Sequence, residues 1–187
     1  MDLTSLFIEV VQEDMNSKSA KKSSLIKEWL TKDAVPQSIL IRCGNWMETF
    51  LVKCLGDKNK LDLLKKKGRN MIITVDGEDH QIDLLGQMED GVLITREIKC
   101  NLDLDRGKTR DTLRREEQIE RGLEEQFDVS VDGGIFCPFY YGTIKKDGKF
   151  GMIFGMQWFI DTFELDFTVE DFQKIGKSEE LHKLLGL

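Results

Sequence analysis

Residues 95–100, T-R-E-I-K-C, end a predicted strand and contain an acidic and a basic side chain two positions apart. Because side chains alternate across a strand, we expect Glu97 and Lys99 to project from one face and Ile98 from the other. Asp83 lies fourteen residues before Glu97, in the run Q-I-D-L-L-G of the preceding predicted strand, and a short M-E-D-G turn joins the two strands. We therefore expect the two carboxylates to converge beside the lysine.

Two neighbouring carboxylates repel each other, and each raises the pKa of the other unless a cation joins them. Oxygen ligands of this kind suit Mg²⁺, for which we expect Mn²⁺ to substitute. A metal held by carboxylates can activate a water and neutralise charge on phosphorus-bound oxygens during phosphodiester hydrolysis. Lys99 would orient or help deprotonate that water, or would offset charge on the phosphate, and the sequence leaves these roles open.

This pattern resembles the PD-(D/E)xK nucleases, a superfamily that includes most type II restriction endonucleases. The chain departs from the family pattern at Ile82, which stands where the family has proline. The segment G-N-W-M-E (residues 44–48) is similar to the G-x-x-x-E on the helix before the sheet in many such enzymes. Residues 97–105 also resemble the E-x-K-x-N-x-x-L-D continuation of some restriction enzymes. The resemblance covers about residues 44–127. It implies four catalytic residues: Asp83, Glu97, Lys99 and Glu48. The three acidic ones would bind the metal.

The resemblance implies a Mg²⁺-dependent, sequence-specific endonuclease that hydrolyses the phosphodiester bonds of double-stranded DNA. Two subunits of a type II restriction endonuclease each cut one strand of a symmetric site, so we expect a homodimer. A DNA junction or repair nuclease with the same site is one alternative, although such proteins tend to be shorter and more basic. The other is a non-catalytic binding or scaffold protein with a nuclease-like fold, in which Glu97 and Lys99 form only a same-face ion pair.

Basic residues follow the predicted catalytic strand, and we expect them to meet DNA phosphates: Lys108, Arg110, Arg114 and Arg115. Basic side chains supply most of the sequence-independent affinity of proteins for DNA. The alternative is a charged helix face that pairs with the glutamates of residues 116–120. Three further lysines, within residues 145–149, surround a D-G turn, and there we favour a solvated hairpin tip over a DNA-reading ribbon.

Apolar residues at helical intervals predict helices over residues 3–15, 23–30, 38–55 and 108–127, with short helices near Thr168 and Ser178. Three β-rich runs predict consecutive antiparallel strands: M-I-I-T-V-D-G, H-Q-I-D-L-L-G-Q and G-V-L-I-T-R-E-I-K-C. Two aromatic runs flank the turn K-K-D-G-K and predict another hairpin. The second of these runs is K-F-G-M-I-F-G-M-Q-W-F-I. The expected fold is an α/β domain whose mixed central sheet is flanked by helices, like the restriction-endonuclease core, with the metal site at one sheet edge.

The chain of 187 residues fits a single nuclease domain over residues 1–187, with a core at about 38–160 and terminal helices in 1–37 and 165–187 as additions. Its net charge of −7 opposes DNA binding through bulk charge, although the first 70 residues hold more basic than acidic side chains. No apolar run is long enough to span a membrane, and no secretory signal is evident, so we expect a cytoplasmic protein. The four cysteines lack zinc-site spacing, which favours free thiols.

Overall fold

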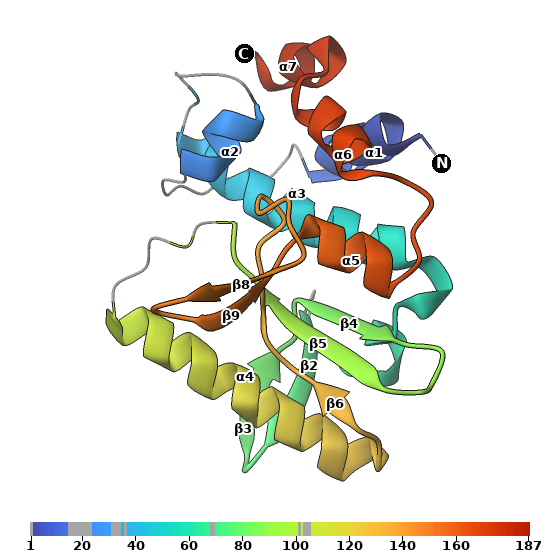
Figure 1. Ribbon diagram of the computed structural model, residues 1–187, viewed down its shortest axis with the longest axis vertical. Coiled ribbons are helices and arrows are strands. Elements are labelled where there is room, and N and C mark those ends of the chain that lie inside the picture. The colour runs from blue at the N-terminus through green and yellow to red at the C-terminus, as the bar shows by residue number, and fades with distance from the viewer. Residues whose placement is uncertain are drawn as a thin grey trace.

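Helices surround two β-sheets in the computed structural model, which describes residues 2–14, 24–30, 35, 37–67, 70–100, 102 and 106–187 (Figure 1). The helices are α1 (Leu3–Asp14), α2 (Ser24–Trp29), α3 (Gln37–Leu55), α4 (Arg106–Phe127), α5 (Met156–Thr162), α6 (Val169–Gly176) and α7 (Glu179–Leu185), with 3-10 turns η1 (Gly56–Lys58) and η2 (Leu61–Leu63). The four long helix predictions are confirmed with shifts of at most two residues at their ends. The two short C-terminal helices are confirmed as well, with Thr168 and Ser178 as N-caps.

The strands form a mixed sheet and a smaller antiparallel sheet. They are β1 (Lys65–Lys67), β2 (Asn70–Val75), β3 (Glu78–Gln81), β4 (Leu84–Gln87), β5 (Leu93–Ile98), β6 (Val131–Asp132), β7 (Ile135–Phe136), β8 (Ile144–Asp147) and β9 (Gly151–Phe154). The larger sheet has the order β4-β5-β7-β9-β8, and β6 pairs with β5 beside β7. Strand β5 is antiparallel to β4 but parallel to β6 and β7, so the sheet is mixed and the α/β class is confirmed. Strands β1, β2 and β3 form the separate sheet.

Two strand predictions need correction. The run H-Q-I-D-L-L-G-Q is two strands, because β3 pairs with β2 in one sheet and β4 pairs with β5 in the other. Ile82 and Asp83 form the passage between the sheets. A hairpin, β8–β9, does form around K-K-D-G-K, but the aromatic run before it contributes β7, which is parallel to β5 and β9, and the aromatic run after it enters α5 at Met156. Met156, Phe159 and Ile160 have helical spacing and bury one side of α5, which outweighs the β propensity of the aromatic residues.

Residues on the two faces of the larger sheet belong to different hydrophobic cores. Ile94 and Ile98 of β5 join a core formed with α1, α2, α3, α5, α6 and α7. Leu93 joins a second core, which contains Ile119 and Leu123 of α4 together with residues of the smaller sheet. Helix α4 crosses the molecule on the other side of the sheet from α3, as Figure 1 shows. Strand β5 is therefore covered on both faces, and its side chains reach two different environments.

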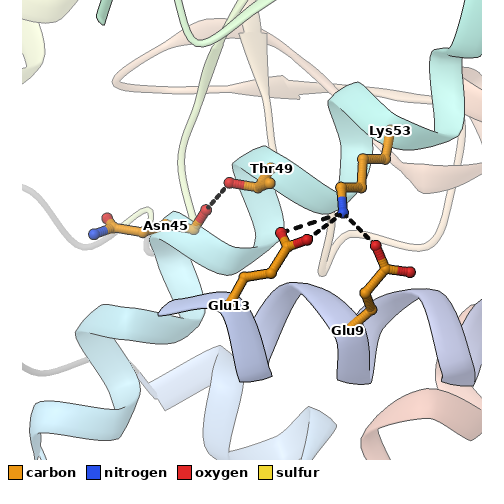
Figure 2. Close-up of polar contacts among 5 residues, drawn as sticks. All are labelled: Glu9, Glu13, Asn45, Thr49 and Lys53. Atoms are coloured by element: carbon orange, nitrogen blue, oxygen red, sulfur yellow. Dashed lines mark hydrogen bonds and ion pairs between the residues drawn. The ribbon is translucent and has the colours of Figure 1, made fainter. Parts of the chain in front are cut away.

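Helix α3 is fixed against α1 by apolar contacts and by a polar contact at its surface. The rings of Phe7 and Phe50 lie 5.3 Å apart in an edge-to-face arrangement. Lys53 Nζ lies 2.9 Å from Glu9 Oε1 and 3.3 Å from Glu13 Oε2, as Figure 2 shows. These exposed ion pairs contribute at most about 1 kcal/mol each, so the apolar contacts dominate. This packing fixes the helix that carries Glu48. Within the described part of the chain, no helix is long and apolar enough to cross a membrane.

Candidate active site

The end of β5 places an acidic side chain between two basic ones. Glu97 is only 2% exposed; Lys99 pairs with its Oε1, and Arg115 of α4 pairs with its Oε2. Ile98, between Glu97 and Lys99, is buried in the core on the α3 side of the sheet. The alternation expected from the sequence therefore directs Glu97 and Lys99 to one side, where α4 lies.

Asp83 is held at the same end of the sheet by a backbone contact. It precedes the first residue of β4, and its Oδ2 accepts a hydrogen bond of 3.0 Å from the backbone N–H of Ile98. Burial, and after it the negative charge of Glu97, raise the pKa of Asp83 to about 7, although Lys99 and the Ile98 N–H oppose this rise. Asp83 and Glu97 therefore interact electrostatically, although Asp83 lies in the β3–β4 passage and Glu97 in β5. Since β4 is the edge strand, this pair lies at the edge of the sheet.

Glu48 joins the same electrostatic cluster from α3. Its side chain is partly buried. Burial, and after it the negative charges of Asp83 and Glu97, raise the pKa of Glu48 to about 8, although the positive charges of Lys99 and Arg115 oppose this rise. Negative charges from the β3–β4 passage and from β5 therefore disfavour the ionised form of Glu48, and the charge of Glu97 disfavours that of Asp83. A cation placed among them would relieve that repulsion.

A cavity of about 370 Å³ opens beside Glu97 and Lys99 and is closed on its other side by α4. Two of the predicted DNA-binding residues, Lys108 and Arg115, line it. The sequence analysis missed two other lining residues, Asp111 and Thr112. A signal for them existed, because residues 108, 111, 112 and 115 have the spacing of a single helical stripe.

The other two predicted DNA-binding residues, Arg110 and Arg114, do not line this cavity. They line a second cavity of about 500 Å³ together with Leu113 of the same helix and Lys149 of the β8–β9 turn. The four basic residues therefore do not form one cluster, because a helix turns by about 100° per residue and separates close neighbours in sequence. Asn101, Leu104 and Asp105, of the restriction-enzyme-like continuation, lie outside the described residues.

The carboxylate cluster has the chemistry of a divalent-cation site but is not a closed cage of ligands. Across the described ranges, no group of three or more His, Cys, Asp or Glu side chains is arranged to hold a metal ion. Mg²⁺ commonly binds to one or two carboxylates, with water and substrate phosphate completing its shell. Asp83 and Glu97, with Glu48 nearby, fit that open kind of site, since all are oxygen donors and since repulsion among them adds to the effect of burial in raising the pKa values of Asp83 and Glu48.

Searches of family models, curated proteins and solved structures found no match to this chain.

Proposed function

We propose that this chain is a Mg²⁺-dependent endonuclease that hydrolyses phosphodiester bonds in double-stranded DNA. The observation that carries the proposal is the convergence of Glu48, Asp83 and Glu97 with Lys99 at one sheet edge, next to a cavity. The resemblance to the PD-(D/E)xK nucleases implies a helix, three strands and a helix in this order; the chain has α3, then strands of which β4 and β5 belong to the larger sheet, then α4. In its more specific form, the proposal is that the chain has a restriction-endonuclease-like core and acts as a sequence-specific, homodimeric type II enzyme.

Each residue of the site has a distinct role in the proposed reaction. Asp83 and Glu97 would hold the divalent cation, with Glu48 as a further ligand or a nearby negative charge. When bound, such a cation would supply a water of lowered pKa and charge neutralisation at the phosphate. Lys99 orients the attacking water or offsets charge on the phosphate, and its contact with Glu97 fixes where its ammonium lies. Lys108 and Arg115 line the cavity and attract the phosphate backbone.

The direct test is incubation of purified protein with plasmid and long mixed-sequence DNA, with Mg²⁺ or with EDTA. We expect cleavage only with Mg²⁺ or Mn²⁺, and loss of cleavage in Glu97→Gln. Glu89→Gln is the matched control, because Glu89 is an exposed glutamate in the turn of the same hairpin. Discrete fragments would support a sequence-specific enzyme, whereas a smear would contradict the type II assignment. Light scattering with and without DNA tests the homodimer.

A specific observation also favours the non-catalytic alternative. Both carboxylate oxygens of Glu97 are already paired, one with Lys99 and the other with Arg115, so this cluster is partly neutralised by the protein itself. A binding or scaffold protein would retain such a cluster for stability alone. Calorimetric titration with Mg²⁺ and with Ca²⁺ separates the two functions without relying on activity. The enzyme binds these ions through Asp83 and Glu97, whereas the scaffold binds neither and leaves plasmid DNA intact.

A further inference from the structure

The second cavity lies on the side of α4 that faces away from Glu97. Its α4 residues include Arg110, Leu113 and Arg114, whereas the stripe of residues 108, 111, 112 and 115 lines the cavity beside Glu97. At about 100° per residue, these two sets point to nearly opposite sides of the helix. Figure 1 shows the β8–β9 hairpin ending beside the N-terminal half of α4, which closes the second cavity from the other side.

The charge in this cavity comes from two elements. Arg110 and Arg114 are exposed on α4, and Lys149 is exposed in the β8–β9 turn, with Glu117 as the acidic residue of the lining. The turn is held in shape by Asp147, whose Oδ1 accepts hydrogen bonds from the backbone N–H of Lys149 at 2.7 Å and of Phe150 at 2.9 Å. The positive groups thus border one recess and do not simply project from separate parts of the surface. Guanidinium groups suit phosphate oxygens, which they can bind in pairs.

We propose that this recess binds the DNA backbone at a phosphate about three nucleotides from the one at Glu97. The distance follows from the width of α4: a helix with its side chains is about 10–12 Å across. One strand of DNA rises about 3.4 Å per nucleotide, so a strand that crosses the N-terminal half of α4 advances by about three nucleotides. The inference rests on the proposed function, and it assigns Lys149, expected from the sequence to be merely solvated, to the substrate-binding surface.

The test measures binding of a fluorescently labelled 30-base-pair DNA duplex by anisotropy in EDTA, so that no cleavage intervenes. The variant Arg110→Gln/Arg114→Gln removes two charges from the recess. The control Lys65→Gln/Lys66→Gln removes two charges from exposed residues of β1 and has the same change in net charge. We expect the recess variant to bind about tenfold more weakly at 0.1 M salt and to lower the slope of log K against log salt by about 1 to 2. Equal binding by the recess variant and the control would overturn the assignment.

Two further measurements separate the recess from the hydrolytic site. If wild-type protein cleaves DNA, a neutral methylphosphonate three nucleotides from the cut should weaken binding by wild type but not by the recess variant. Sensitivity that persists in the variant would overturn the assignment. If wild type binds through Arg110 and Arg114 but never cleaves with Mg²⁺, the proposed nuclease function fails and the recess stands. Displacement of the duplex by polyglutamate as readily as by unlabelled DNA would overturn the assignment to a phosphate backbone.

Discussion

Arg96 and Glu97 are consecutive residues of β5 and both are buried, but their charges are stabilised in different ways. The Arg96 guanidinium lies 4.0 Å from the centroid of the Phe154 ring and 4.5 Å from that of Trp158. Its Nη1 donates a hydrogen bond of 2.8 Å to the backbone oxygen of Thr95, and its Nη2 lies 2.8 Å from Asp132 Oδ2. Protein groups thus surround this cation, and Arg96 has no exposed surface. The arrangement is that of a structural buried charge.

Glu97 lies beside a cavity and among charges that do not fully compensate one another. Lys99 and Arg115 pair with it, but Asp83 and Glu48 add negative charge from two other elements. The acidic groups of the cluster therefore outnumber its basic groups, and Glu97 borders the cavity. The comparison suggests that burial alone does not distinguish a functional charge from a structural one. A cluster of like charges that borders accessible space is the more informative sign.

The largest effect that we expect is on the Glu97 side. Asp83→Asn keeps the shape of the side chain but weakens metal binding, so we expect cleavage to slow by about a thousandfold, in the upper range seen when one preorganised electrostatic group is lost. The melting temperature should stay within a few degrees of wild type. Single-turnover cleavage and circular dichroism melting measure the two quantities. Cleavage by Asp83→Asn at the wild-type rate would place the reaction elsewhere.

On the Arg96 side we expect loss of stability without loss of chemistry. Arg96→Ala empties a fully buried site and removes the packing of the guanidinium on Phe154 and Trp158, and truncating a large buried side chain costs about 3 kcal/mol. For a chain of this size the melting temperature should fall by roughly 6–12 °C. At a temperature where the variant is folded, its cleavage rate per molecule should match wild type. A variant that melts normally but does not cleave would show that Arg96 acts in the site itself.

Metal and pH should act together on the stability of the carboxylate cluster. Folding raises the pKa of Glu48 to about 8 and of Asp83 to about 7, so between about pH 4 and pH 8 the folded chain binds more protons than the unfolded chain. Their stabilising contribution is therefore complete below about pH 4 and is lost as the pH rises through 7 to 8. Mg²⁺ at 100 times its dissociation constant should restore about 2.7 kcal/mol at pH 8, or several degrees in melting temperature.

Glu116 provides the control for that experiment. It is buried in α4, it accepts a hydrogen bond of 3.3 Å from the backbone N–H of Gly134, and burial raises its pKa to about 8. Glu48→Gln and Glu116→Gln should both reduce the fall in melting temperature with pH. Only Glu48→Gln should also reduce the stabilisation by Mg²⁺. Thermal melts from pH 4 to pH 8 with and without Mg²⁺ distinguish the two, and equal Mg²⁺ responses would contradict a cation site at Glu48.

The smallest expected effect concerns Arg115. Its positive charge lowers the pKa values of Glu48 and Asp83, so Arg115→Gln should move the ionisation of these groups to higher pH. We expect the rising limb of the pH–rate profile to shift upward by less than about one pH unit. Arg121→Gln is the control, because Arg121 lies on the same helix but pairs with Asp76. A downward shift, or the same shift in both variants, would show that Arg115 does not lower the pKa values of Glu48 and Asp83.

The strand errors show what local patterns leave open. The run H-Q-I-D-L-L-G-Q has the composition of one strand, but its first part pairs with β2 and its last part with β5, and these partners belong to two sheets. The aromatic residues after Gly155 have strong β propensity, yet Phe159 is fully buried on a helix. In both cases the tertiary arrangement outweighed a local preference.

The amino-acid sequence by itself determined that Glu97 and Lys99 share a face of their strand and that Ile98 does not, because alternation is a property of the extended backbone. It also determined the helices, whose apolar spacing is local. Only the tertiary structure decided that Arg115 contacts Glu97 while Arg114, one residue earlier, borders a different cavity. The rotation of α4 about its axis is set by its packing on β2, β5 and β6, and short sequence patterns do not encode that packing.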